Sequence, residues 1–359
     1  MSKEYEWKLQ DLEKVKKNGL KVFSCFACGG GSTMGYKLAG YEVLGCNEID
    51  PKLMATYIKN HHPKYSFLEP IQTFKLRDDL PEELYHLDIL DGSPPCSNFS
   101  MAGNREKDWG KEKKFREGQT NQVLDTLFFD FIDLTKKLQP KVVVSENVKG
   151  LLLGNATKYV SRIYDEFDKA GYYTKQFLLD ASTMGVPQRR VRVFFISIRK
   201  DLMEKIGSED LLKIIPKLNL KFNDPKIPYK DIEEQDGNEN AYGIIPGYLE
   251  YWKKVKPGRT IGDVHPKGNG FTYFKLHPDL IVPTLRAGSN DYTHYEKERH
   301  LFDREILKAS TFPLDYNLCG SKAIYICGMS VPPLMIKKIS QEIYNQWFTK
   351  LSTDNIIDK

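Results

Sequence analysis

The stretch FSCFACGGGSTMGYKLAG, residues 23–40, sets three consecutive glycines between an apolar run and a helical pattern. The apolar run at 20–26 predicts a strand, and the residues from Gly31 onward predict a helix. Glycines at such a turn let a ligand approach the backbone closely, and the helix N-terminus points at that ligand. Glu48, in NEID at the end of the next apolar run, can accept hydrogen bonds from ribose hydroxyls. Together these features predict a site for an adenosine-containing cofactor.

Two other interpretations of the glycine turn stay open at this point. Such turns in α/β proteins are often purely structural, and a nicotinamide dehydrogenase has a similar one. Dehydrogenase fingerprints follow the order G-x-G-x-x-G, whereas here Gly29, Gly30 and Gly31 are adjacent and Gly35 comes later. The dehydrogenase pattern therefore fits poorly.

The first half of the chain alternates short β-rich runs with helical stretches, which is typical of a mostly parallel, doubly wound α/β sheet. Besides 20–26, the predicted strands are 42–49, 87–93, 141–147 and 191–198. The predicted helices are 31–40, 51–62, 126–140, 159–171 and, near the C-terminus, 332–348. From about residue 200 the sequence becomes rich in Pro, Asn, Asp and Gly without a sustained period, which predicts a domain boundary there.

The composition excludes several classes of protein. The chain has 359 residues, 40% of them hydrophobic, and a formal charge of +5, which fits a polyanionic partner but is also common in ordinary enzymes. No apolar run is long enough to span a bilayer, and the charged N-terminus lacks the apolar centre of a signal peptide, so we expect a cytoplasmic protein. Cys25 and Cys28 could form a redox pair or half a zinc site, but no second pair has zinc spacing. Buried thiols, no disulfide and no metal are therefore expected.

A second segment, LDILDGSPPCSNFSMAG at 87–103, points to the chemistry. Pro94 and Pro95 stiffen the turn before Cys96. This turn lies at the carboxyl end of a predicted strand, where ligands bind in open α/β sheets. A single cysteine is more often a small buried hydrophobic residue than a nucleophile. The two prolines and the Ser/Asn/Gly-rich loop around Cys96 favour a nucleophile.

Two further polar segments lie at the ends of apolar runs, one after a run and one before. Glu146, in SENVKG, is either a solvated carboxylate at a strand end or an acid that contacts a ring nitrogen of a substrate. In GVPQRRVRVFFIS, Gln188, Arg190 and Arg192 alternate on one face of an incoming strand. A basic face is usually exposed to solvent, but this one leads into the very apolar VFFIS, which predicts a buried strand with charges at its mouth.

Taken together, these segments resemble the DNA (cytosine-5)-methyltransferase family, and the resemblance runs in order over nearly the whole chain. FACGGGSTMGYKLAG resembles the family's cofactor loop, NEID its ribose-binding strand, GSPPCSNFS its Pro-Cys nucleophile loop, SENV its Glu-Asn-Val motif and PQRRVR its Gln-x-Arg-x-Arg motif. RHLFDREILKASTFPLDY and GMSVPPLMIKKIS resemble its last two motifs. Several motifs in the correct order make a chance match very improbable.

The resemblance implies a mechanism and the residues that perform it. The Cys96 thiolate adds to carbon 6 of a cytosine that has been flipped out of duplex DNA, and S-adenosylmethionine then methylates carbon 5. Glu146 contacts ring nitrogen 3 and the amino group, while Arg192, with Arg190 behind it, steadies the carbonyl. The implied cofactor-binding residues are Phe26, Ala27, Gly29, Gly30, Gly31, Glu48, Ile49, Ile71, Pro94, Ser330 and Val331. The implied DNA-binding residues are Ser97, Ser100, Arg105, Gln188, Lys253 and Arg259.

The implied architecture is a Rossmann-like S-adenosylmethionine-dependent methyltransferase sheet, with a small target-recognition domain inserted before the C-terminal helix. We expect a catalytic domain at 1–200 completed by 324–359, a target-recognition domain at 201–300 and a hinge at 301–323. The basic stretch at 102–122, which contains Trp109, is expected to close as a lid over DNA phosphates, although it could be a solvated loop. Aromatic and basic residues of the recognition domain are either DNA contacts or its core and solvated rim: Tyr251, Trp252, Lys253, Lys254, Arg259, Phe271 and Arg286.

The chain departs from the family pattern at four places. Cys28 replaces the first glycine of the cofactor loop, and Pro70 replaces an aspartate that faces the adenine, where Glu69 or backbone could substitute. Gly328-Met329 replaces a Gly-Asn pair, which puts the role of Ser330 in question, and Ser97 replaces a common glutamine. None of these changes removes a catalytic group.

Two alternatives remain from the sequence. One is a tRNA cytosine-5 methyltransferase on the same fold, since the recognition region is short; the other is a non-catalytic DNA-binding regulator, against which the intact Cys96, Glu146 and Arg192 argue. We expect a monomer acting on double-stranded DNA in the bacterial cytoplasm at the nucleoid, without membrane association and with a cognate restriction endonuclease as a possible partner. The sequence does not predict which DNA site is recognised.

Overall fold

The computed structural model describes residues 3–95, 126–153, 157–210, 213–235, 243–288 and 291–353. The chain forms two compact units, each made of three segments. The sheet unit comprises residues 15–179, 191–221 and 336–359, and the second unit comprises 1–14, 180–190 and 222–335. These limits differ from the predicted domains, because residues 201–221 belong to the sheet unit and the predicted hinge at 301–323 lies inside the second unit.

The sheet unit is built on a seven-stranded sheet with the order β3-β2-β1-β4-β5-β7-β6. Its strands are β1 (Lys21–Cys25), β2 (Glu42–Glu48), β3 (Tyr65–Leu68), β4 (Ile89–Gly92), β5 (Val142–Val148), β6 (Tyr172–Asp180) and β7 (Val191–Arg199). Pairing is parallel from β3 through β5, whereas β7 runs antiparallel to β5. The predicted mostly parallel α/β sheet is therefore confirmed, and each of the five predicted strands is present.

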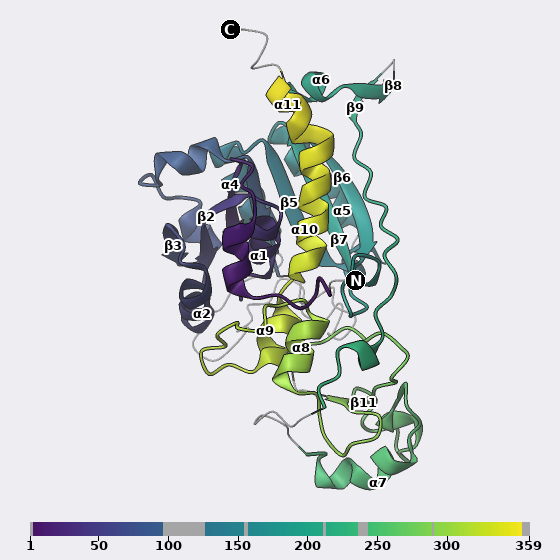
Figure 1. Cartoon of the computed structure of the whole chain (residues 1–359). Helices are drawn as coiled ribbons and strands as arrows, with labels where there is room; N and C mark the ends of the chain where they lie inside the picture. The colour runs from purple at the N-terminus through teal and green to yellow at the C-terminus, as the bar shows by residue number, and fades with distance from the viewer. Residues whose placement is uncertain are drawn as a thin grey trace. The chain divides into compact units, whose positions relative to one another are not determined.

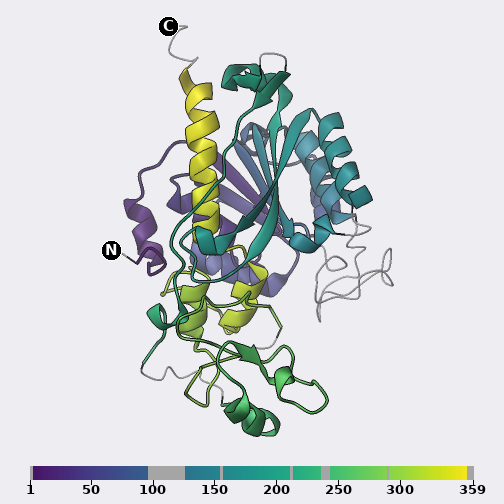
Figure 2. The same cartoon turned by 90° about the vertical axis from the view of Figure 1, so that its right-hand side faces the viewer.

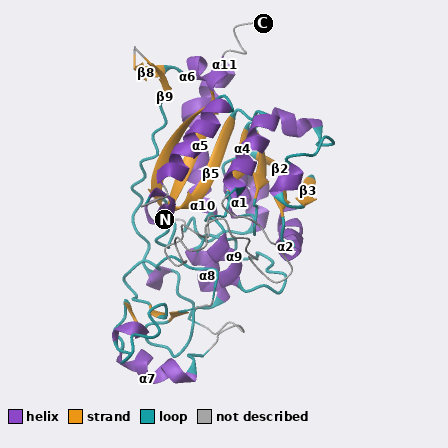
Figure 3. Ribbon diagram, turned by 180° about the vertical axis from the view of Figure 1, so that it is seen from behind, coloured by secondary structure: helices purple, strands orange, loops and turns teal. Residues whose placement is uncertain are grey.

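Helices cover both faces of this sheet. The helices of the sheet unit are α1 (Gly31–Leu38), α2 (Pro51–His61), α3 (Ile71–Phe74), α4 (Leu127–Leu138), α5 (Thr157–Lys169), α6 (Met203–Ile206), α10 (Pro333–Ile343), which ends in a π-helical turn at Tyr344–Phe348, and α11 (Thr349–Thr353). Seen from the front and from behind, α1 and α10 lie on one face of the sheet and α4 and α5 on the other (Figures 1 and 3). Turned by 90°, the sheet lies between α10 and α5 (Figure 2).

Short elements complete the sheet unit. They are the 3-10 helices Glu82–His86, Lys149–Leu152 and Lys200–Leu202, and the two-stranded ladder of β8 (Ser208–Asp210) and β9 (Lys213–Pro216). Helix α10 is tied to the sheet by Tyr41, the residue before β2, whose hydroxyl donates to the Ser340 carbonyl at 2.8 Å. Among the described residues, no helix is both long enough and apolar enough to cross a bilayer.

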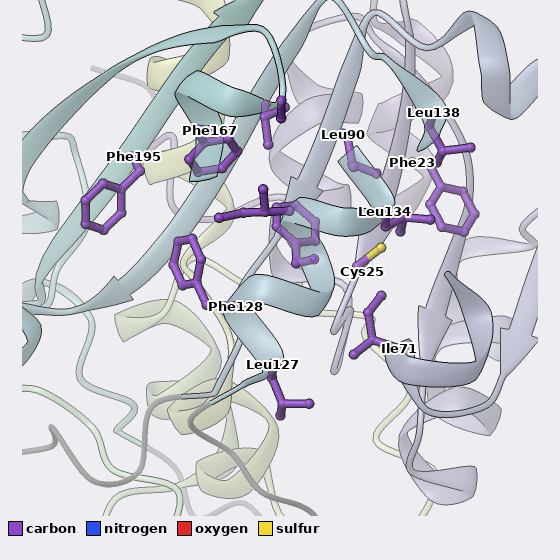
Figure 4. Close-up of a cluster of buried hydrophobic side chains, with 14 of the residues drawn as sticks. Phe23, Cys25, Ile71, Leu90, Leu127, Phe128, Leu134, Leu138, Phe167 and Phe195 are labelled. Atoms are coloured by element: carbon purple, nitrogen blue, oxygen red, sulfur yellow. The ribbon is translucent and has the colours of Figure 1, made fainter. Parts of the chain in front are cut away.

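The core of the sheet unit lies between the sheet and helices α4 and α5. Alternate residues of the strands, such as Phe23 on β1 and Leu90 on β4, are buried in one cluster with Phe128 of α4 and Phe167 of α5 (Figure 4). The face alternates along a strand, so Ser24 and Asp91 point to the opposite face, toward α1. Burial of this continuous aromatic and aliphatic cluster is the main contribution to the stability of the unit.

The second unit contains few regular elements. They are α7 (Pro246–Lys254), α8 (Asp303–Ala309), α9 (Ala323–Met329), the three-stranded sheet of β10 (Arg259–Thr260), β11 (Phe274–Lys275) and β12 (Tyr292–Thr293), and the 3-10 helices Leu9–Lys14, Ala181–Thr183, Tyr229–Asp231 and Ile261–Asp263. A small apolar cluster around Trp252 and Tyr273 forms one core. The Arg299 guanidinium pairs with the fully buried Glu305 at 2.8 Å, and Glu305 also accepts from the Tyr229 hydroxyl. Buried polar contacts therefore contribute much of the order in this unit.

Candidate active site

The glycine loop connects β1 to α1 at the carboxyl end of the sheet. Gly30 caps the helix with a φ of 76°, and the non-glycine residues Phe26 and Cys28 also have positive φ values, 54° and 48°. Cys28 thus takes up, with a side chain, the left-handed backbone that a glycine would adopt more easily. Gly29 and Gly31, on either side of Gly30, leave the turn free of side chains.

Glu48, the last residue of β2, is joined to this loop by hydrogen bonds. Its carboxylate accepts from the backbone N–H of Cys28 at 2.8 Å, of Ile49 at 2.8 Å and of Asp50 at 3.0 Å. The side chain is buried, and burial raises its pKa, although these backbone N–H groups act in the opposite direction. The contact with Cys28 brings the two sequence features that predict a cofactor site, the glycine loop and Glu48, into one place.

The other predicted cofactor residues fall into both units. In the sheet unit Ala27, Ile71 and Pro94 are buried, and Ile71 begins α3. In the second unit Ser330 and Val331 are buried at the end of α9. Glu69, considered above as a substitute for the missing aspartate, pairs through its carboxylate with Arg77 at 2.9 Å and accepts from Thr73 at 2.8 Å.

The segment before the predicted nucleophile leaves β4 beside β1. Pro94 is buried, and its carbonyl accepts from the side-chain amide of Asn147 at 3.1 Å. Asn147 lies on β5, next to Glu146, so the Pro-Pro turn is fixed to the strand that carries the predicted acid. Cys96 itself lies outside the described residues, as do Ser97, Ser100, Arg105 and the predicted lid at 102–122.

Glu146 and Arg192 form an ion pair in the sheet unit. The Arg192 Nε lies 2.9 Å from Glu146 Oε1, and both side chains are largely buried, with exposed fractions of 14% and 11%. The pair follows from the antiparallel ladder of β5 and β7, in which Val148 lies opposite Arg192. The sequence predicted both residues, and the sheet brings them together.

Asp91 on β4 is a buried carboxyl group that the sequence analysis missed. It accepts from the Ser24 hydroxyl at 2.8 Å and from the Tyr36 hydroxyl at 3.2 Å. Burial raises its pKa to about 7; hydrogen bonds from Ser24, Tyr36 and Ser32 oppose the shift, and the negative charge of Glu146 adds to it. An aspartate inside an otherwise apolar strand is the only signal that could have identified it from the sequence.

Gln188 and Arg190 do not lie on the strand that carries Arg192, because β7 begins at Val191. Both are buried in the second unit. The Arg190 guanidinium donates to the carbonyls of Leu285 at 3.2 Å and Gly328 at 3.0 Å. The Gln188 amide accepts from the Leu285 N–H at 3.2 Å. The prediction of one shared strand face for these residues and Arg192 is therefore wrong.

Of the three predicted DNA-binding residues in the second unit, Gln188 is buried, whereas Lys253 and Arg259 are exposed and paired with acids. The Nζ of Lys253, on α7, lies 3.5 Å from Oε1 of Glu298. The Nε of Arg259, on β10, lies 2.9 Å from Oδ2 of Asp263. By contrast Trp252 is buried, and its indole N–H donates to the Thr293 hydroxyl at 2.9 Å. Of the aromatic and basic residues considered for this region, Trp252 therefore belongs to the core.

Comparison with known proteins identifies the family to which the chain belongs. The family model described as C-5 cytosine-specific DNA methylase matches residues 20–345. The chain belongs to the C-5 cytosine-specific DNA methylase family. It is a DNA cytosine-5 methyltransferase, as the order of its motifs predicted. Its activity is thus the transfer of a methyl group to cytosine in DNA.

Individual relatives in this family align over most of the chain. The Type II methyltransferase M.NgoPII of Neisseria gonorrhoeae is 33% identical and aligns with 93% of this chain and 98% of its own length. The Type II methyltransferase M1.HphI of Haemophilus parahaemolyticus is 29% identical, over 90% of this chain and 86% of its own. The solved structure of a Spodoptera frugiperda DNMT2 mutant has a TM-score of 0.64 at 18% identity, covering 91% of this chain and all of its own, which supports the same fold.

Proposed function

We propose that this methyltransferase takes its methyl group from S-adenosylmethionine and transfers it to carbon 5 of a cytosine flipped out of duplex DNA, through a covalent adduct with Cys96. The observation that carries the proposal is the set of contacts at the carboxyl ends of β1, β4 and β5 and at the amino end of β7, which runs antiparallel to β5. There the glycine loop, the Pro94 turn and the Glu146–Arg192 pair leave adjoining strands. Ligands of open α/β sheets bind at this edge, where the strand order reverses.

Cys96 follows the Pro94 turn after a single residue. Carbon 5 of cytosine is too weak a nucleophile to take a methyl group unaided, so addition of a thiolate at carbon 6 is needed to create an enamine. A free thiol has a pKa of about 8.5, so the site has to favour the thiolate or remove the proton during attack. After methyl transfer, loss of the carbon 5 proton breaks the bond to Cys96 and restores the ring.

The Glu146–Arg192 pair supports the binding and activation of the base. The guanidinium holds the Glu146 carboxyl group in one orientation, where it would contact ring nitrogen 3 and the amino group of the cytosine. Arg192 would stabilise negative charge that develops at the cytosine carbonyl. In this proposal Arg190 is a positioning residue, because its guanidinium is occupied by the carbonyls of Leu285 and Gly328.

The residues around the glycine loop fit an adenosine-containing cofactor. The turn at Gly29–Gly31 exposes backbone rather than side chains, and the buried Glu48 carboxylate lies beside it. Three of its about four lone pairs accept from backbone N–H groups, which leaves about one for a ribose hydroxyl. Phe26, Ala27, Ile49, Ile71 and Pro94, all in the sheet unit, would complete this site. The predicted roles of Ser330 and Val331, which belong to the second unit, stay predictions. S-adenosylmethionine would supply a sulfonium methyl group, which a nucleophilic carbon can take directly.

The second unit would recognise the DNA target. Lys253 and Arg259 are exposed and would exchange their acidic partners for phosphates or bases. Gln188 would have to break its buried hydrogen bonds to reach DNA. We therefore expect it to hold the neighbouring segment in place rather than to contact DNA itself. The predicted roles of Ser97, Ser100 and Arg105, the monomeric state, the nucleoid location and a cognate endonuclease remain predictions.

The proposal is tested by following methyl transfer from labelled S-adenosylmethionine to duplex DNA of mixed sequence and to tRNA. The product in DNA is mapped as 5-methylcytosine, and wild type is compared with Cys96→Ala. Cys319→Ala, which removes an exposed thiol, is the matched control. A duplex containing 5-fluorocytosine tests the adduct directly, because fluorine cannot leave as a cation and the cysteine bond would persist through denaturing electrophoresis.

We expect label in DNA and a denaturation-resistant complex for wild type and Cys319→Ala, and neither for Cys96→Ala. Label only in tRNA would identify an RNA methyltransferase on the same fold. Cofactor binding without methyl transfer to either nucleic acid would identify a non-catalytic regulator.

A further inference from the structure

A buried histidine lies against the glycine loop from the side of α2. His61 is the last residue of α2, and its side chain is buried, with 5% of the residue exposed. Its Nε2 lies 3.2 Å from the Gly29 carbonyl oxygen. A Cβ atom built on Gly30 would lie only 2.1 Å from the same nitrogen. The imidazole therefore fills the space next to the turn and contacts its backbone.

The direction of this hydrogen bond determines which ring nitrogen of His61 carries a hydrogen. A carbonyl oxygen only accepts, so Nε2 must carry the hydrogen. Burial lowers the pKa of His61 to about 3, with a smaller contribution from the charge of Lys37, so the ring is neutral at physiological pH. The neutral ring with hydrogen on Nε2 is thus a permanent donor to the Gly29 carbonyl.

Helix α2 also contacts α1 at two further points, one near the start of α1 and one near its end. The Tyr57 ring packs edge-on against the His61 ring at 4.6 Å, and its hydroxyl lies 2.8 Å from the Thr33 hydroxyl. The Lys37 ammonium donates to the His61 carbonyl at 2.9 Å. Because Thr33 and Lys37 belong to α1, both ends of α1 are held from α2, and the contact of Thr33 lies close to the glycine loop.

The loop needs such external support because its own backbone is unfavourable. Phe26 and Cys28 both have side chains and positive φ values, which cost about 1 kcal/mol or more for each such residue. Conformations of this kind persist only where the surroundings enforce them. The hydrogen bond from His61 and the one from Cys28 to Glu48 hold the loop from its two sides.

We propose that His61 is a positioning residue of the cofactor site, which holds the Gly29–Gly30 turn in its binding conformation by donating from Nε2 to the Gly29 carbonyl. This inference rests on the proposed function, in which the glycine loop binds S-adenosylmethionine. His61 itself would touch neither the cofactor nor the cytosine. Its loss is therefore expected to weaken cofactor binding without changing the chemical step.

Two substitutions separate the donor from the bulk of the ring. Glutamine places its side-chain amide nitrogen near the position of the imidazole Nε2, whereas the amide of asparagine ends near the position of Nδ1. We expect His61→Gln to bind S-adenosylmethionine within about twofold of wild type, and His61→Asn to bind about tenfold more weakly, as for the loss of one hydrogen bond. The rate at saturating cofactor should stay within about twofold for both. Binding is measured by titration calorimetry without DNA, and His62→Gln and His62→Asn, at the exposed neighbour, are the matched controls.

The tautomer provides a measurement that is independent of catalysis. Long-range proton–nitrogen NMR spectra of the histidine rings should show His61 with hydrogen on Nε2 and no titration down to about pH 5. Equal weakening by both substitutions, or wild-type binding by His61→Asn, would overturn the proposal, as would a ring with hydrogen on Nδ1. If wild type and the His62 variants also failed to bind S-adenosylmethionine, the result would instead refute the proposed function, since His61 is intact in all of them.

Discussion

Replacing Asp91 by asparagine should change how the stability of the sheet unit depends on pH. Asp91 is 2% exposed and accepts hydrogen bonds from Ser24 and Tyr36. Burial raises its pKa from the ordinary 3.8 to about 7, against the opposing effect of these hydroxyls. In the unfolded chain the same carboxyl group would ionise near its ordinary value. Between about pH 4 and pH 7 the folded protein therefore binds one more proton than the unfolded chain.

The sign and size of the effect follow from this difference in bound protons. The protonated carboxyl group contributes stability fully below about pH 4, and the contribution is lost as pH rises to about 7. The slope is about 1.4 kcal/mol for each pH unit in that interval, so from pH 5 to pH 8 the loss amounts to about 3 kcal/mol. Asparagine stays neutral at every pH, so Asp91→Asn removes this loss. Relative to wild type, the variant should gain about 3 kcal/mol in free energy of unfolding between pH 5 and pH 8.

Urea unfolding followed by circular dichroism at pH 5, 6, 7 and 8 measures the difference directly. Asp78→Asn, which removes a fully exposed carboxylate, controls for the loss of one negative charge. A difference between wild type and Asp91→Asn that stays constant across these pH values would refute the reasoning, whatever its absolute size. An offset that does not vary with pH is expected in addition, because the amide nitrogen of asparagine cannot accept a hydrogen bond from either hydroxyl.

Three further substitutions test other contacts. Arg192→Ala leaves its buried carboxylate partner without a guanidinium, so the free energy of unfolding should fall by about 3 kcal/mol, measured with urea, and methyl transfer should be lost with it. Glu305→Gln leaves the Arg299 guanidinium unpaired inside the second unit, and limited proteolysis should cut that unit faster than in wild type. Gly45→Ala puts a Cβ atom 1.8 Å from the Tyr65 carbonyl oxygen, a clash between β2 and β3 that should lower Tm by several degrees in a thermal melt.

The sequence predicted the central strands well because their apolar runs are buried on both faces. The two strands of the seven-stranded sheet that it missed lie at the edges of this sheet. β3 has only four residues and alternates between half-buried and exposed positions, and β6 contains the polar pair Lys175 and Gln176. An edge strand is solvated on one side and does not need a continuous apolar run. The antiparallel direction of β7 could not be predicted from the sequence either. Strand β6 precedes β7 in the chain, but in the sheet β7 lies next to β5 and β6 forms the edge.

Site residues that belong to a sequence motif could be predicted, whereas residues whose role depends on contacts formed by folding could not. Glu146 and Arg192 were identified from their motifs, and the sheet pairs them. The buried roles of Asp91 and His61 depend on partners far away in the chain, namely Ser24 and Tyr36 for the carboxyl group and Gly29 for the ring. Likewise, the second unit has two-residue strands, which produce no periodic pattern that sequence reasoning could detect.

The pairing of β1 with β4 brings Asp91 and the glycine loop, which His61 contacts, to the same end of the sheet. In this parallel ladder Ser24 lies opposite Asp91 and Cys25 opposite Gly92, so the two strands end side by side. The glycine loop and the Pro94 turn therefore start about 5 Å apart, at a separation set by backbone hydrogen bonds. A Cβ atom at Gly92 would lie 2.5 Å from the Phe131 ring, so this strand end has no room to shift into the core. Asp91 joins β1 and β4 on the α1 face through the hydroxyls of Ser24 and Tyr36, and His61 contacts the glycine loop from α2, so both groups hold the start of the glycine loop next to the Pro94 turn.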